Sequence, residues 1–310
     1  QCARHHVILK AGRPAVTCGE RIEVALTLVR HAPGRRGEEL EVSVRGPSGV
    51  DGQPRAWAAP AGEGVHELGA IAIDAGQDGG EWRVSARLLQ GGEALAESSE
   101  AVLVLTPVDL REVAAQVACV GEAPAPLLAA EAKGPAAHTV LLAARPATVS
   151  EGDWHRLLDA VAEGRTAVIG PLHQRDALPQ RLLNERGVPL RLHYGIGNWM
   201  GCYHWLPNSE LSAGLPAGGF AGEAYVDVLP WYVMTEMGGD VLAGSLRNTQ
   251  TRREPPAILW YSDIEAAPYG QGTLIFCQYR VFEQAGANPI AATLLRNLVG
   301  LAVRSGPAGR

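Results

Sequence analysis

Cysteine, aromatic side chains and long apolar runs are all scarce in this 310-residue chain. No segment approaches the roughly 20 apolar residues that are needed to cross a bilayer. The net charge of −6 comes with scattered arginines rather than a basic stripe. The cysteines are odd in number and show no CxxC spacing, so they indicate neither a zinc site nor a disulfide framework: Cys2, Cys18, Cys119, Cys202 and Cys277. We therefore expect a soluble chain that binds no metal, no membrane and no nucleic acid.

The chain does have the length and the apolar content for two domains with separate cores. Hydrophobic residues make up 46% of it and charged residues 19%, which is typical of a folded protein. It begins with Gln1, and residues 1–20 contain no hydrophobic core of a signal peptide. We expect a piece of a longer or processed protein, whose cellular compartment the sequence leaves open.

Residues 1–108 alternate between apolar and polar side chains, which is the pattern of half-buried antiparallel strands. Glycine-rich turns separate the alternating segments, and no helical period occurs. The segments are 21–28, 40–45, 65–73, 81–89 and 101–105. They predict a β-sandwich of the immunoglobulin type, with Trp82 in its core. We interpret the charged cluster of Arg35, Arg36, Glu38 and Glu39 as a solvated hairpin tip.

Residues 109–310 instead alternate short apolar runs with helical patterns. The runs suit strands buried on both faces: 117–120, 139–143, 166–169, 257–261 and 273–277. Cys119 and Cys277 lie in such runs and are expected to be buried. A capping motif at Ser150 starts one helix, 175–186 forms a second, and Asn288-Pro289 opens a third. The pattern predicts an α/β domain with a doubly wound, mostly parallel, flavodoxin-like sheet.

The segments SELSAGLPAGGFAGEAYVDVLP (209–230) and APYGQGTLIFCQYRVFEQAGANPIAATLLRNLVGL (267–301) resemble the C-terminal region of bacterial glycoside hydrolase family 2 proteins. The resemblance spans most of residues 110–303 and, more loosely, the first hundred. It implies an immunoglobulin-like module followed by a domain of the class I glutamine amidotransferase-like fold, both placed after a catalytic barrel. It also implies a bacterial protein, either cytoplasmic or secreted.

A catalytic nucleophile of the amidotransferase type is not evident in the sequence. Such an enzyme places Cys or Ser between glycines on a tight strand-to-helix turn, and neither GxCxG nor GxSxG occurs. The expected turn after 166–169 reads Gly170, Pro171, Leu172, His173. Cys202, two residues before His204, leaves a hydrolase as one alternative, although neighbours in a loop seldom form a catalytic pair.

Two further site patterns are weak. The segment 195–201 (GIGNWMG) nearly matches a dinucleotide-binding motif, but its third glycine comes late and no helix follows, so no cofactor is predicted. The acids Glu223, Asp227, Asp263 and Glu265 lie beside strands, and we interpret them as exposed turn residues. A glycosidase acid pair belongs to a barrel of about 250 residues, for which this chain has no room beside two domains.

Residues 194–232 hold eight aromatic side chains, well over a third of those in the chain. Clustered rings serve either as anchors of a protein interface or as platforms that stack on sugars. We predict a non-catalytic accessory region that packs against the catalytic barrel or a homo-oligomer partner. A carbohydrate-binding module using 194–232 is the alternative. The predicted binding or interface residues are Tyr194, Trp199, Tyr203, His204, Trp205 and Trp231.

Overall fold

The computed structural model describes residues 4–49, 55–128, 140–194, 202–235, 237–248 and 258–305. The chain divides into two compact units, Gln1–Pro107 (unit 1) and Val108–Arg310 (unit 2). This division falls one residue before the boundary predicted between 108 and 109.

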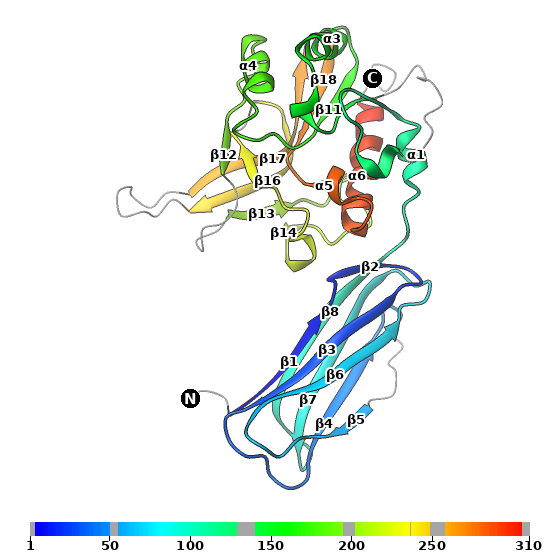
Figure 1. The fold of residues 1–310 in the computed structure, drawn as a ribbon, viewed down its shortest axis with the longest axis vertical. Helices are drawn as coiled ribbons and strands as arrows, with labels where there is room; N and C mark the ends of the chain where they lie inside the picture. Colours follow the sequence, from blue (N-terminus) through cyan, green and yellow to red (C-terminus); the bar gives the residue numbers. More distant parts are fainter. Residues whose placement is uncertain are drawn as a thin grey trace. The chain divides into compact units, whose positions relative to one another are not determined.

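Unit 1 consists of strands, drawn from blue to cyan in Figure 1. In chain order these are β1 (His5–Ala11), β2 (Ala15–Thr17), β3 (Arg21–Arg30), β4 (Glu38–Arg45), β5 (Arg55–Ala58), β6 (Gly64–Asp74), β7 (Gly80–Gln90) and β8 (Glu93–Leu105). They form a three-stranded sheet in the order β1-β3-β6 and a five-stranded sheet in the order β2-β8-β7-β4-β5. All these pairs are antiparallel except β2 with β8.

The two sheets of unit 1 enclose one hydrophobic core. Alternate residues point to the same side of a strand, so Val24, Leu26 and Leu28 of β3 share this core with Val84 and Leu88 of β7. The structure thus confirms that the alternating segments of residues 1–108 are strands with one buried face. Trp82, predicted as core, is only half-buried and packs against the rim of this cluster.

The charged cluster at the start of β4 is not fully solvated, which corrects the sequence interpretation. Glu38 is buried, and its Oε2 lies 2.6 Å from Nη1 of the buried Arg30. Its Oε1 accepts a hydrogen bond of 2.9 Å from the backbone N–H of Arg35. Arg35, Arg36 and Glu39 are exposed as expected. The sequence neighbours of Glu38 did not indicate Arg30 as its partner, because Arg30 lies eight positions earlier, at the end of β3.

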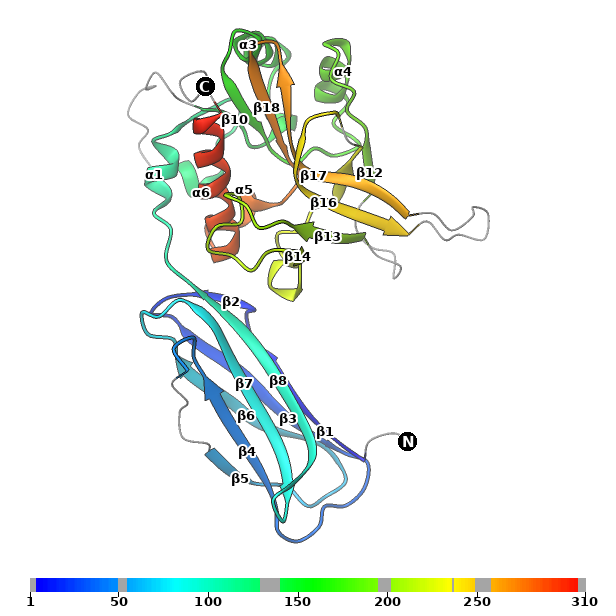
Figure 2. The same ribbon diagram turned by 180° about the vertical axis from the view of Figure 1, so that it is seen from behind.

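Unit 2 contains strands and helices (Figures 1 and 2). In chain order the described elements are α1 (Leu110–Ala114), β9 (Val117–Cys119), α2 (Ala125–Leu128), β10 (Val140–Ala143), α3 (Glu151–Ala162), β11 (Thr166–Ile169), α4 (Ala177–Glu185), β12 (Leu192–Tyr194), β13 (Cys202–Leu206), β14 (Gly219–Phe220), β15 (Tyr232–Met234), β16 (Asp240–Asn248), β17 (Ile258–Tyr269), β18 (Gly272–Cys277), α5 (Val281–Gln284) and α6 (Pro289–Arg304). The strands belong to one mixed sheet with the main order β14-β13-β16-β17-β18-β11-β10-β9, which β12 and β15 join through β17.

Four parallel strands, β9, β10, β11 and β18, carry helices on both faces. Ala167 and Ile169 share a hydrophobic core with Trp154 and Leu158 of α3. Val168 between them points to the other face, where α6 packs on β10 and β11. Two of the three predicted helix starts are confirmed, because the Ser150 side chain caps α3 and the Asn288 side chain caps α6.

The other half of the sheet is antiparallel, so the prediction of a mostly parallel sheet is right only for β9, β10, β11 and β18. Strands β13, β16, β17 and β18 pair in antiparallel fashion one after another. The run 257–261 was expected to be a strand buried on both faces. It instead begins the twelve-residue β17, whose first three residues are exposed. An apolar run of this length does not by itself reveal which faces are covered.

None of the helices in the described part of the chain is long and apolar enough to cross a membrane.

Candidate functional site

The antiparallel half of unit 2 carries a row of apolar side chains across three neighbouring strands. Tyr203 of β13 stands opposite Leu246 of β16, and Leu246 stands opposite Trp260 of β17. Residues directly opposite each other point to the same face of a sheet. Tyr203 is 55% exposed and Trp260 59% exposed, so this face is open to solvent.

Two further apolar side chains extend the row. Phe220 of the edge strand β14 is 63% exposed, and its ring centroid lies 5.7 Å from that of Tyr203. Ile258, two residues before Trp260 on the same face of β17, is also 63% exposed. We call Tyr203, Phe220, Leu246, Ile258 and Trp260 the aromatic face. None of these five side chains carries a charge.

Trp205, a predicted site residue, lies beside the aromatic face but is half-buried. It stands opposite Gly244 of β16. A Cβ atom at Gly244 would come within 2.8 Å of the Trp205 ring. The indole therefore lies directly on the glycine backbone, and its role is packing of β13 against β16.

The opposite face of these strands carries a buried polar group. Nδ1 of His204 lies 2.7 Å from Oδ2 of Asp263, and the Ser245 hydroxyl donates a bond of 2.9 Å to Oδ1 of the same carboxylate. His204 is only 5% exposed, so it is not available to a partner or ligand at the surface. The expectation that His204 belongs to a surface site is therefore corrected. In a strand its side chain points away from that of its neighbours Tyr203 and Trp205.

Cys202 does not have the features of a nucleophile. Burial raises the pKa of its thiol to about 11, and the nearby Asp263 carboxylate acts in the same direction. The reactive thiolate is therefore scarce at neutral pH. The Nδ1 atom of His204 is engaged by Asp263. These contacts argue against the alternative of a Cys202/His204 hydrolase.

The acids of β17 were expected to be exposed, and that expectation is wrong. Asp263 and Glu265 are both fully buried. Oε1 of Glu265 accepts hydrogen bonds from the backbone N–H groups of Met237 and Gly239, at 2.8 and 2.9 Å. The reason is that β17 continues far beyond the predicted run and carries both acids into the middle of the sheet. Glu223 and Asp227 are exposed, as expected.

Of the two cysteines expected to be buried, one is buried and the other is exposed. Cys277, at the end of β18, is buried, and burial raises the pKa of its thiol to about 12. Cys119 is exposed at the end of β9. Strand β9 stands at the end of the described sheet order, so it has a neighbouring strand on one side only.

A second group of rings gathers where the chain leaves β11 and β18. His173 lies edge-on to both Trp231 and Tyr232, with centroid distances of 5.7 and 5.2 Å. The ring of Tyr194 lies 5.7 Å from that of Tyr232. The guanidinium carbon of Arg280 lies 5.2 Å from the centroid of the Trp231 ring. We call these five side chains the Trp231 row.

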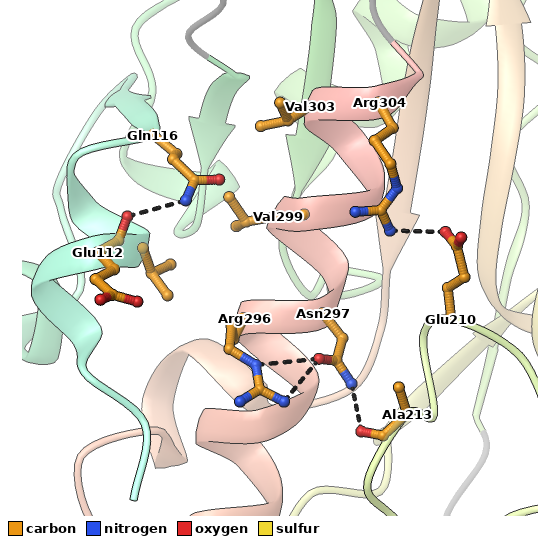
Figure 3. A pocket seen from close by; sticks show the side chains of 11 residues that line it. Glu112, Gln116, Glu210, Ala213, Arg296, Asn297, Val299, Val303 and Arg304 are labelled. Atoms are coloured by element: carbon orange, nitrogen blue, oxygen red, sulfur yellow. Dashed lines mark hydrogen bonds and ion pairs between the residues drawn. The ribbon is translucent and has the colours of Figure 1, made fainter. Parts of the chain in front are cut away.

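A surface pocket of about 630 Å³ lies between α1 and α6 (Figure 3). Its polar groups bond to one another: Arg304 pairs with Glu210, and Arg296 donates to the side chain of Asn297. The amide of Asn297 in turn donates to the Ala213 carbonyl oxygen. No sequence pattern indicates this pocket, because its lining residues are typical of a solvated helix face.

Some predicted features lie outside the described residues. These are Cys2, Trp199 and the glycine-rich segment 195–201. Within the described ranges, no three His, Cys, Asp or Glu residues are placed to hold a metal ion.

No model of a known protein family matches this chain, and no curated protein matches it in sequence. Solved structures show local similarity to this chain, and three of them are the following. The CARDB domain of a Pyrococcus furiosus protein in complex with di-metal ions has a TM-score of 0.26 and 12% identity, and the match covers 33% of this chain and 87% of the domain. Alkylpurine DNA glycosylase of Pseudomonas fluorescens, bound to DNA, has a TM-score of 0.24 and 19% identity, covering 34% and 31%. Superoxide reductase (neelaredoxin) of Ignicoccus hospitalis has a TM-score of 0.25 and 11% identity, covering 33% and 82%. Similarity at these scores supports no statement about function.

Proposed function

We propose that this chain is a non-catalytic accessory region whose aromatic face binds another protein surface. The observation that carries the proposal is the aromatic face itself. Four of its five residues, Tyr203, Phe220, Ile258 and Trp260, are more than half exposed and lie on a single sheet face, with Leu246 between Tyr203 and Trp260. Contiguous exposed apolar patches of this kind mark interaction sites, and aromatic rings are the usual anchors of such interfaces.

The partner has an apolar surface, because the aromatic face offers no charged group for an ion pair. A second copy of this chain meets that requirement through its own aromatic face, as in a two-fold symmetric interface. Another domain of the same polypeptide, such as a catalytic barrel, is the other candidate. In either case the isolated chain exposes rings that are covered in the assembled protein.

We further propose that unit 1 is an immunoglobulin-like module and unit 2 a degenerate amidotransferase-like domain, as in the tail of a family 2 glycoside hydrolase. Two sheets around one core support the first part. Parallel strands with α3 and α6 on opposite faces support the second. An antiparallel extension through β17, β16 and β13 distinguishes unit 2 from a simple doubly wound sheet.

The residue at the position expected for an amidotransferase nucleophile supports a non-catalytic role. After β11, where a nucleophile would stand on a tight turn, the chain places Leu172, which is fully buried. The backbone N–H of Leu172 donates a 3.0 Å hydrogen bond to Oε1 of the buried Gln278. Leu172 therefore packs in the core and presents no group to a substrate.

Sedimentation velocity of the purified chain tests the proposed interface. We expect the weight-average sedimentation coefficient to rise across micromolar concentrations, because the uncovered aromatic face self-associates. The double variant Tyr203→Ser, Trp260→Ser should remain monomeric with little change in melting temperature. Tyr194→Ser, Trp231→Ser removes two similarly exposed rings outside the aromatic face and should associate like the unmodified chain. Equal association of all three proteins would overturn the proposal.

A further inference from the structure

The Trp231 row forms a second surface, separate from the aromatic face, with a different composition. It combines three aromatic rings, an imidazole and a guanidinium in one continuous series of contacts: Arg280, Trp231, His173, Tyr232 and Tyr194. Trp231 is 42% exposed and Tyr194 54% exposed, while the other three are half-buried or less exposed. The row therefore has solvent-accessible rings supported by partly covered ones.

The row is built at the carboxyl ends of two parallel strands. His173 follows β11, and Arg280 follows β18, which pairs with β11 in parallel. Buried Gln278 connects the two loops by accepting a hydrogen bond from the Leu172 backbone. In sheets with parallel strands, loops at this edge form the usual place for ligands, because all the strands deliver their connections there. The fold thus holds the row on a rigid support.

Arg280 is fixed in position but keeps unused donors. Its backbone N–H donates to the Val228 carbonyl oxygen at 2.9 Å, its Nε to the Leu229 carbonyl oxygen at 3.1 Å, and its Nη2 to the Val226 carbonyl oxygen at 3.4 Å. These bonds fasten Arg280 to the segment that leads into Trp231. No carboxylate within the described residues pairs with Arg280. A guanidinium has five N–H donors, so among the described contacts both donors of Nη1 and one of Nη2 remain for a bound anion.

The ring contacts of the row are edge-to-face, with interplanar angles of 70–73° along the series from Trp231 to Tyr194. Such contacts place the edge of one ring against the face of the next. The Arg280 guanidinium lies over the Trp231 ring, and Trp231 and Tyr194 are still 42% and 54% exposed. Exposed Trp and Tyr rings stack on the apolar faces of sugar rings. A guanidinium beside them matches a carboxylate with two parallel hydrogen bonds.

We propose that the Trp231 row is a binding site for an acidic saccharide, in which sugar rings lie on Trp231 and Tyr194 and a uronate carboxylate is bound by Arg280. This site goes beyond the protein interface of the aromatic face and does not depend on it. It specifies the ligand class for the carbohydrate-binding alternative raised from residues 194–232. His173 and Tyr232 lie between the two exposed rings in this series of contacts.

Calorimetric titration of the intact chain with trigalacturonate and with a hyaluronan tetrasaccharide tests the proposal. The matched neutral probe is fully methyl-esterified trigalacturonate, which keeps the sugar rings and removes the charge. We expect at least one acidic probe to bind and the ester to bind about tenfold more weakly or worse, because it lacks the charge-assisted pair. Trp231→Ala should weaken binding of the acid by about tenfold or more through loss of stacking.

Two variants separate ligand contact from folding. Arg280→Lys keeps the charge but not the planar fork, so we expect reduced discrimination between acid and ester with the melting temperature nearly retained. Tyr203→Ala removes a similarly exposed ring on the aromatic face and should bind the acidic probe like the unmodified chain. Absence of binding of both acidic probes at millimolar concentration, equal binding of acid and ester, or unchanged binding by Trp231→Ala would each overturn the site.

Discussion

Nδ1 of His204 lies 2.7 Å from Oδ2 of Asp263, and both side chains are buried inside unit 2. The contact joins β13 to β17 across the intervening β16, whose Ser245 bonds to the other oxygen of the same carboxylate. A buried carboxylate is costly without partners, so these two bonds determine whether Asp263 is tolerated in the interior. This polar group lies beneath the aromatic face and fixes the strands that carry it.

Removal of either partner should therefore destabilise unit 2. We expect His204→Ala to lower the free energy of unfolding by about 3 kcal/mol, since it leaves a buried carboxylate with one partner. Asp263→Asn should cost less, because the amide is uncharged. Urea denaturation of both single variants and of the double variant measures the interaction free energy between the two side chains. Strictly additive effects would mean that the two side chains do not interact in solution.

The contact between Trp205 and Gly244 predicts a strong effect of one methyl group. Gly244→Ala places a Cβ atom 2.8 Å from the Trp205 ring, so the indole or the strand must shift. We expect a loss of about 1–3 kcal/mol, the usual cost of overpacking, and a change in tryptophan fluorescence. Gly219→Ala in β14 is the control, because a Cβ atom there meets nothing within 4 Å. Equal stability of the two variants would contradict the packing.

The buried pair of Arg30 and Glu38 predicts a pH dependence for unit 1. Burial acts to raise the pKa of Glu38, but the Arg35 N–H and the Arg30 guanidinium outweigh it and lower the pKa below its usual value. A carboxyl with a lowered pKa in the folded state adds stability above its unfolded pKa. That stability is lost as the pH falls through the folded pKa.

Glu38→Gln measures this contribution. The stability difference from the unmodified protein should be constant above about pH 5 and shrink toward about pH 3. Glu39→Gln, at an exposed neighbouring position, should show little difference at any pH. If the Glu38→Gln difference does not change over this range, the carboxylate is not held by its partners as described.

The division after Pro107 predicts a site of limited proteolysis. The segment from Thr106 to Asp109 is largely exposed and lies between β8 and α1. Proteases cut exposed connections between compact units first. We expect cleavage between 106 and 110 to release a stable piece containing unit 2, identified by mass spectrometry. Cleavage that never precedes global unfolding would mean that the units do not fold separately.

The sequence was sufficient where a local signal determines the structure. Ser150 and Asn288 mark the starts of α3 and α6 through side-chain caps, and both positions are confirmed. It failed where the deciding partner is remote. Glu38 depends on Arg30 in the preceding strand, and Asp263 depends on His204, 59 positions away. Burial of these charges could not be inferred from their neighbours.

The aromatic face was only partly predictable for a related reason. Tyr203 was named from the density of rings in 194–232, but Trp260 and Ile258 lie outside that segment. The sequence predicts a strand buried on both faces there, because the run contains no polar residue to mark an exposed side. Only the pairing of β13, β16 and β17 shows that Tyr203 and Trp260 stand in one row. His173 and Arg280 were missed because their partner Trp231 comes from a different part of the chain.

Hydroxyl-radical footprinting tests the proposed interface most directly. The purified chain is oxidised at low and at high concentration, and modification of Trp260 and Tyr203 is compared with that of Trp231 and Tyr194 in the same molecules. We predict that oxidation of Trp260 and Tyr203 falls as concentration rises, because association covers the aromatic face, while Trp231 and Tyr194 stay equally reactive. Undiminished oxidation of Trp260 and Tyr203 in associated chains, or an equal fall at all four rings, would contradict the account.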